Sequence, residues 1–124
     1  MVGTYDINGK LRAEINYIDD LTVSRAYFAD GPGIWEPQGH IVALPSGVTV
    51  ESYIEQCLEA TLNYMRNSVN SPINYPANGW GINSNSWNQS IHEFLGGDTV
   101  VHDYNGIDYG NGKRVPLWYF RKPR

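Results

Sequence analysis

Residues 83–86, Asn-Ser-Asn-Ser, are the part of the sequence whose residue types and spacing could do chemistry. They lie where an apolar helical pattern begins. Hydroxyl and amide side chains at such a position commonly accept hydrogen bonds from the first helix N–H groups, which lack partners. A hydroxyl there is also a candidate nucleophile, because the positive end of the helix dipole stabilises an oxyanion. The residues by themselves leave both interpretations open.

A serine nucleophile needs a neighbouring general base, and the chain contains three histidines. His40, near the start of the apolar run at residues 39–44, is the first choice for a base acting on Ser84. His102, in an expected strand at residues 99–104, is the second. His92 lies eight residues beyond Ser84, about 12 Å along the same helix axis, which is too far for direct proton transfer.

The order of these features resembles the circularly permuted papain-like (NlpC-related) superfamily over residues 40–97. Gly39-His40 precedes a long insertion, and Asn-Ser-Asn-Ser-Trp then opens a helix that ends in Gly-Gly. The segment is also similar to Asn-Ser-Asn-Ser-aromatic segments in C-terminal domains of bacterial polymorphic toxins and phage-associated proteins. The resemblance implies a small hydrolase, in some contexts a toxin domain, that cleaves an amide or ester bond in a peptidoglycan peptide, a protein or an acyl ester. Ser84 would stand at the nucleophile position, with His40 as the base.

The sequence departs from that superfamily at the nucleophile, because position 84 carries Ser where the family has Cys. The family's third catalytic residue also has no clear match after His40. Three explanations compete: a natural serine variant, a protein that keeps the scaffold only for binding, and an engineered replacement of Cys. The alternative function is therefore a non-catalytic binding or structural module, for instance one associated with a phage or with secretion.

Strands are expected at residues 1–7, 11–18, 21–28, 39–44, 99–104 and 115–120, and helices at residues 49–67 and 83–95. Asn8-Gly9 favours a tight hairpin between the first two strands. Gly96-Gly97 offers a left-handed cap for the second helix. This order predicts an α+β fold with an antiparallel sheet and two main helices. The resemblance implies that the fold is of the permuted papain-like type.

The helix at residues 49–67 is expected to begin at a cap formed by Thr49 or Ser46. Its apolar residues recur at three- and four-residue spacing, which is typical of a buried stripe. The members of this stripe are Ile54, Cys57, Leu58, Thr61, Leu62 and Met65. With the second helix, they predict a core that contains Ile54, Leu58, Leu62, Trp87, Ile91 and Phe94. Cys57 is expected to act as a small buried hydrophobe.

Two loops rich in Gly and Pro closely precede the two motif residues. The loop at residues 30–38 leads to His40, and the loop at residues 68–82 leads to Ser84, so the loops converge if these residues meet. They contribute Trp35, Tyr75 and Trp80, and binding clefts are commonly walled by aromatic rings. We therefore predict a groove for a peptide, glycopeptide or acyl substrate, with Asn83 and Asn85 offering amide hydrogen bonds. Alternatively, the tryptophans anchor the loops to the core.

The 124 residues fit a single domain, and their net charge of −4 argues against a nucleic-acid partner. The single cysteine excludes an internal disulfide and a Cys-rich zinc site. Residues 103–112 are rich in oxygen ligands but lack the spacing of an EF-hand. No cofactor and no metal are therefore expected. The sequence has neither an 18-residue apolar run nor a secretory signal pattern, which predicts a soluble domain without a transmembrane segment. It does not identify a cognate protein partner.

Overall fold

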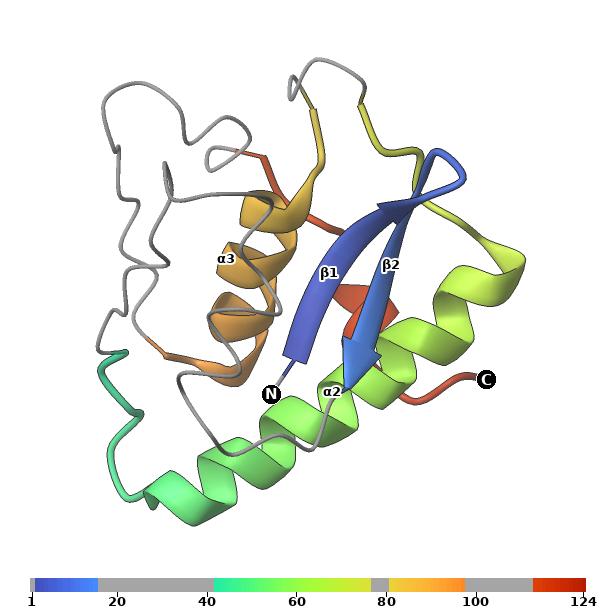
Figure 1. Cartoon of the computed structure of the whole chain (residues 1–124). Helices are drawn as coiled ribbons and strands as arrows, with labels where there is room; N and C mark the ends of the chain where they lie inside the picture. Colours follow the sequence, from blue (N-terminus) through green and yellow to red (C-terminus); the bar gives the residue numbers. More distant parts are fainter. Residues whose placement is uncertain (1, 16–41, 77–80, 98–112) are drawn as a thin grey trace, which may run out of the picture.

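The computed structural model describes residues 2–15, 42–76, 81–97 and 113–124 of the chain. Within these ranges the fold is α+β (Figure 1). Its elements are β1 (Val2–Ile7), β2 (Lys10–Ile15), α2 (Val50–Asn70), α3 (Ser84–Leu95) and a short 3₁₀ helix, η1 (Leu117–Phe120). The strands expected at residues 21–28 and 99–104 and the loop expected at residues 30–38 lie outside the described ranges.

The hairpin expected around Asn8-Gly9 is confirmed. β1 and β2 pair antiparallel, with Ile7 opposite Lys10 and Val2 opposite Ile15. Asn8 and Gly9 both have positive φ, 53° and 75°, as a two-residue turn between twisted strands requires. The turn is closed by the Gly9 N–H, which donates to Asp6 Oδ1 at 2.9 Å. Asn and Gly tolerate this backbone better than other residues, which is why the dipeptide predicts the turn.

The second edge of β2 is covered by residues 73–75, which the sequence assigned to a loop. Asn74 forms an isolated antiparallel bridge with Lys10. The Leu11 N–H donates to the Ile73 carbonyl at 2.9 Å, and the Tyr75 N–H donates to the Gly9 carbonyl at 2.8 Å. This short segment therefore ties the chain after α2 to the hairpin.

The first expected helix is confirmed as α2. Thr49 is its N-cap, and Thr49 Oγ1 accepts a hydrogen bond from the Ser52 N–H at 3.1 Å. Glu51 lies in the first turn, where the helix dipole favours a negative charge. The helix continues to Asn70, slightly beyond the expected end at residue 67.

The buried face of α2 differs from the expected one. Ile54 and Leu62, assigned to the core, are 53% and 40% exposed, and Leu58 is only half-buried. The core face instead carries Tyr53, Ala60, Thr61, Tyr64 and Ser68. The physical reason is that large tyrosine rings bury more surface than a leucine and keep their hydroxyls hydrogen-bonded. The prediction was therefore wrong for Ile54 and Leu62 and right for Thr61.

The second expected helix is confirmed as α3, and two of its expected core residues, Trp87 and Ile91, are buried. Phe94 is partly buried against the same core. Beyond Leu95 the chain turns at Gly96, whose φ is 78°. The Gly97 N–H donates to the His92 carbonyl at 2.9 Å, and the Gly96 N–H to the Glu93 carbonyl at 3.2 Å. This is the expected glycine cap at a helix C-terminus.

The strand expected at residues 115–120 is wrong, because this segment forms η1. Pro116 precedes the 3₁₀ helix and has no N–H for a strand ladder. The N–H of buried Val115 is instead accepted by Ser90 Oγ of α3 at 2.8 Å. Residues 42–44, described from the strand expected at residues 39–44, likewise form no strand.

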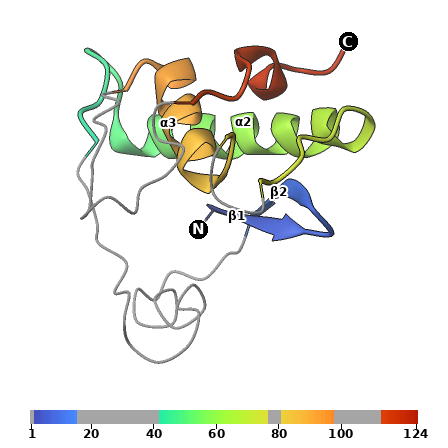
Figure 2. The same ribbon diagram turned by 90° about the horizontal axis from the view of Figure 1, so that it is seen from above.

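The elements form layers around the two helices. Figure 2 shows the β1–β2 hairpin on one side of α2 and α3, and η1 with the C-terminal residues on the other. Two asparagines of α2 hold the C-terminal layer: Asn63 Nδ2 donates to the Phe120 carbonyl at 3.1 Å, and Asn67 Nδ2 donates to the Arg121 carbonyl at 2.8 Å. On the hairpin side, Arg12 donates to the Ser68 carbonyl at 2.8 Å.

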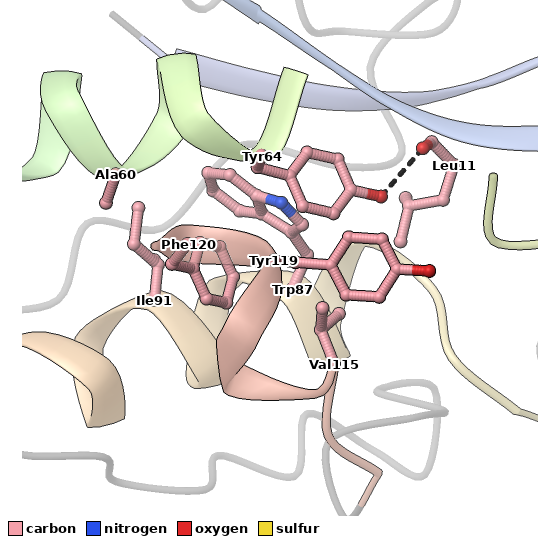
Figure 3. Packing of buried hydrophobic residues seen from close by; sticks show 8 residues of the cluster. All are labelled: Leu11, Ala60, Tyr64, Trp87, Ile91, Val115, Tyr119 and Phe120. Atoms are coloured by element: carbon pink, nitrogen blue, oxygen red, sulfur yellow. Dashed lines mark hydrogen bonds between the residues drawn. The ribbon is translucent and has the colours of Figure 1, made fainter. Parts of the chain in front are cut away.

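The core lies where these layers meet, and aromatic rings fill most of it (Figure 3). Tyr64 of α2 is fully buried, and its hydroxyl donates to the Leu11 carbonyl of β2 at 2.8 Å. Its ring meets the Trp87 ring edge to face at 5.7 Å and the Phe120 ring at 5.8 Å. Tyr64 thus joins the hairpin, α3 and η1, and it fixes how α3 lies in the domain.

Candidate functional site

The start of α3, the candidate catalytic segment, is held by a reciprocal cap. Asn83 Oδ1 accepts a hydrogen bond from the Ser86 N–H at 3.3 Å, and Ser86 Oγ accepts one from the Asn83 N–H at 3.1 Å. The Asn83 carbonyl accepts the helix bond from the Trp87 N–H at 3.0 Å. This arrangement is a capping box, with Ser in place of the more usual Glu. The structural interpretation of the motif is thus confirmed for Asn83 and Ser86, which are both buried.

Ser84 and Asn85 are the first two residues of α3, and the structure describes them by their backbone alone. An α-helix leaves its first N–H groups without intrahelical partners, so the N–H groups of these two residues receive no carbonyl from the helix. They also lie at the positive end of the helix dipole. A negative charge that develops beside Ser84 is therefore stabilised by the local backbone.

The remaining residues of the expected site divide into two groups. His40, Trp35, Trp80 and the second candidate base His102 lie outside the described ranges, so the His40–Ser84 pair and the aromatic groove stay predictions. Tyr75 is described and half-buried, and its ring packs partly against the core. Its backbone N–H is held by the Gly9 carbonyl. This placement connects Tyr75 to the hairpin turn.

A polar contact that the sequence did not indicate joins the two helices near the other end of α3. The Tyr53 hydroxyl lies 2.8 Å from His92 Nδ1, and the two rings are parallel with centroids 6.0 Å apart. Burial lowers the pKa of His92. Burial, and to a lesser extent the nearby Cys57, raises the pKa of Tyr53 to about 12. The hydrogen bond therefore joins a neutral phenol to a neutral imidazole, and the pair fastens α2 to α3.

This contact predicts a pH dependence of stability. Because burial lowers the pKa of His92, the unfolded chain binds a proton at this residue that the folded chain does not. Stability should therefore fall as the pH drops below about 6.5, the pKa of an unperturbed histidine, with a slope of at most about 1.4 kcal/mol per pH unit. Above that pH, His92 contributes no slope.

Urea unfolding of the wild type and of His92→Asn at pH 7.5 and pH 5 checks this expectation. Asparagine keeps an amide that can hydrogen-bond to Tyr53 but does not titrate, and both proteins retain the other histidines, so their titration cancels in the difference. The wild type should lose more stability than the variant on acidification. An equal loss in both proteins would show that His92 is not linked to folding through its proton.

The C-terminal end of α3 also borders a cleft of about 440 Å³, which includes none of the expected site residues. Its walls come from α2, α3, the last residue of η1 and the two residues that follow it. Sequence patterning could not find it, because Glu59 is distant in the chain from its other charged residues, Arg121 and Lys122. The one local signal was the spacing of Gln56, Glu59 and Asn63, which places three polar residues on one side of a helix.

The described part of the chain contains neither a cluster of metal ligands nor a membrane-spanning helix. Among residues 2–15, 42–76, 81–97 and 113–124, no group of three His, Cys, Asp or Glu side chains is placed to hold a metal ion. Within the same ranges, neither α2 nor α3 is long and apolar enough to cross a membrane.

The chain matches no family model, no curated protein and no solved structure. The proposal of a function therefore rests on the residues of the chain itself.

Proposed function

We propose that the chain is a small papain-like hydrolase domain that cleaves an amide or ester bond, with Ser84 at the nucleophile position and His40 as the general base. The substrate class is a peptidoglycan peptide, a protein amide or an acyl ester. A role as a toxin or effector domain is part of the same proposal, on the similarity of the Asn-Ser-Asn-Ser-Trp segment.

The observation that supports the proposal is the capped start of α3. Asn83 and Ser86 hold each other by two hydrogen bonds, and this fixes the backbone of the two residues between them. Ser84 is therefore the first residue of a rigid helix that Trp87 and Ile91 anchor in the core. A nucleophile on a rigid element keeps its geometry better than one on a loop.

The proposed reaction is an acyl transfer in two steps. Ser84 Oγ attacks the carbonyl carbon while His40 accepts its proton, and His40 then gives that proton to the leaving amine or alcohol. The oxyanion formed in between is stabilised by the N–H groups of Ser84 and Asn85, each donor contributing about 3–4 kcal/mol. Water then attacks the acyl-enzyme by the same route, which releases the acid and restores Ser84.

A non-catalytic binding module is the second candidate, and the capping hydrogen bonds favour it. Two of the four polar side chains in the motif, Asn83 and Ser86, have a structural role that needs no reaction. The serine at position 84, where the family has cysteine, also favours a binding module. In that case the helix start would serve as scaffold, and His40 would not act as a base.

Alkylation of an introduced thiol distinguishes the two candidates. Ser84→Cys is made in a Cys57→Ala background and treated with iodoacetamide at pH 6.5, with the rate followed by mass spectrometry. A neighbouring His40 should hold the thiol as thiolate and make it react about tenfold faster than free cysteine. Adding His40→Ala should abolish that advantage.

Val50→Cys is the matched control, because Val50 is the first residue of α2 as Ser84 is of α3, follows the N-cap Thr49, and is exposed. It reports the effect of a helix N-terminus without the histidine. If Ser84→Cys reacts no faster than free cysteine and His40→Ala changes nothing, the hydrolase proposal is wrong.

A further inference from the structure

The cleft between α2, the end of α3 and the chain after η1 is the feature from which we infer a second site. Its volume of about 440 Å³ lies within the range of small-ligand sites. Ser84 is at the opposite end of α3, about 16 Å away along the helix axis. The cleft is thus separate from Ser84, and a ligand could occupy it whether or not Ser84 is a nucleophile.

The α2 wall of the cleft presents hydrogen-bond acceptors. Gln56, Glu59 and Asn63 all line it. Gln56 Nε2 donates to Ser52 Oγ at 3.1 Å, and Asn63 Nδ2 donates to the Phe120 carbonyl at 3.1 Å. Within the described part of the chain, no hydrogen bond uses the amide oxygens of Gln56 and Asn63 or the Glu59 carboxylate. Asn63 is only 6% exposed, so its amide is held in one orientation.

The segment after η1 contributes two cations to the cleft lining, Arg121 and Lys122. The backbone of Arg121 is fixed at both ends, because its N–H donates to the Trp118 carbonyl at 3.1 Å and its carbonyl accepts from Asn67 Nδ2 at 2.8 Å. Neither side chain forms an ion pair with a described residue; the ion pair seen in these ranges joins Arg114 to Glu93. This part of the lining therefore offers positive charge on an anchored segment.

The rest of the lining is apolar and aromatic. Phe94 and Phe120 both line the cleft, and their rings stack with centroids 5.7 Å apart and planes 30° apart. Ala60 and Leu95 complete this part of the lining. An apolar side chain of a ligand would gain by covering these rings, since burial of apolar surface is favourable.

We propose that the cleft binds a short peptide with free termini. The terminal ammonium group would donate its three hydrogens to the oxygens of Gln56, Glu59 and Asn63. The terminal carboxylate would pair with Arg121 and Lys122, and an apolar side chain would cover Phe94 and Phe120. A ligand with one kind of charge would meet repulsion from one wall, and a neutral ligand would leave both charged walls unpaired.

Titration of the full chain with alanylphenylalanine tests the proposal. Isothermal calorimetry should give a dissociation constant on the order of 0.1–1 mM for a ligand of this size. The N-acetyl and the C-terminal amide derivatives each lose one charge and should bind about tenfold more weakly or worse. In an NMR titration, the Asn63 side-chain amide should shift with the free dipeptide. No saturable binding up to about 10 mM, or equal binding of all three compounds, would overturn the proposal.

Two substitutions with matched controls locate the site. Glu59→Gln should weaken dipeptide binding about tenfold while leaving the N-acetyl derivative unaffected, because that compound has no ammonium group. Arg121→Gln should weaken binding of the free dipeptide about tenfold while leaving the C-terminal amide derivative unaffected, because that compound has no carboxylate. Glu55→Gln and Arg124→Gln remove the same charges from α2 and from the tail outside the cleft lining, and should not change binding. If Glu59→Gln and Arg121→Gln bind as their controls do, the cleft is not the binding site.

Discussion

Replacing Tyr64 with alanine is expected to lower the free energy of unfolding by about 3–5 kcal/mol, the range for truncating a buried aromatic side chain. Tyr64 is fully buried and contacts the rings of Trp87, Tyr119 and Phe120. Its loss would leave a cavity where three layers of the fold meet. Urea unfolding monitored by circular dichroism measures the change.

Two further variants separate the causes of that loss. Tyr64→Phe keeps the ring and removes the hydrogen bond to the Leu11 carbonyl, and should cost about 1–3 kcal/mol. Leu62→Ala, on the exposed side of α2, should stay within about 0.5 kcal/mol. If Leu62→Ala cost as much as Tyr64→Ala, the buried face of α2 would be the one that hydrophobicity predicted, and a core centred on Tyr64 would be wrong.

The second large effect is expected at Ser90, whose hydroxyl connects α3 to the C-terminal segment. Ser90 Oγ accepts from the Val115 N–H at 2.8 Å and donates to the Ser86 carbonyl at 2.6 Å. Both Ser90 and Val115 are fully buried. Ser90→Ala would leave the Val115 N–H without an acceptor, which should destabilise the fold by about 1–3 kcal/mol.

Ser52→Ala is the matched control for Ser90→Ala, because it removes a helix serine whose hydroxyl accepts one bond, from the Gln56 side chain, in a partly exposed position. It should change stability by no more than about 0.5 kcal/mol. Hydrogen exchange gives a second readout: the Val115 amide should lose protection in Ser90→Ala and keep it in Ser52→Ala. Unchanged protection in both variants would contradict the role of Ser90.

The features that local sequence could predict are those that local physics decides. Asn8-Gly9 fixes its own turn, since both residues tolerate positive φ. Thr49 caps the start of α2 and the Gly96-Gly97 pair caps the end of α3, each through hydrogen bonds to residues a few positions away. The hairpin, both helices and the α+β class were therefore predictable from neighbouring residues.

The features that could not be predicted depend on distant partners. Asn63 of α2 is buried because its amide finds a partner far along the chain, the Phe120 carbonyl. Hydrophobicity alone assigns Asn63 to the surface and Ile54 to the core. It therefore predicts the wrong side of α2 as the buried one. The aromatic segment at residues 115–120 favours a strand by composition, yet Ser90 and two asparagines of α2 hold it as a 3₁₀ turn.

The candidate site shows the same division. The Asn83–Ser86 cap is a local pattern, and the sequence indicated it. The cleft beside Glu59 and Arg121 joins segments that are distant in the chain, so the spacing of residues in the sequence could indicate its α2 side alone. The proposed pairing of His40 with Ser84 would also be a long-range contact, which a direct view of both side chains decides.

The measurement that tests the central proposal most directly is the distance between the His40 imidazole and Ser84 Oγ in a crystal structure of the chain. The hydrolase proposal predicts that one ring nitrogen lies within about 2.6–3.2 Å of the hydroxyl, or within about 4 Å in the absence of substrate. The space in front of the two groups should be open to a ligand. A longer distance, with no cleft between the two side chains, would contradict the proposal.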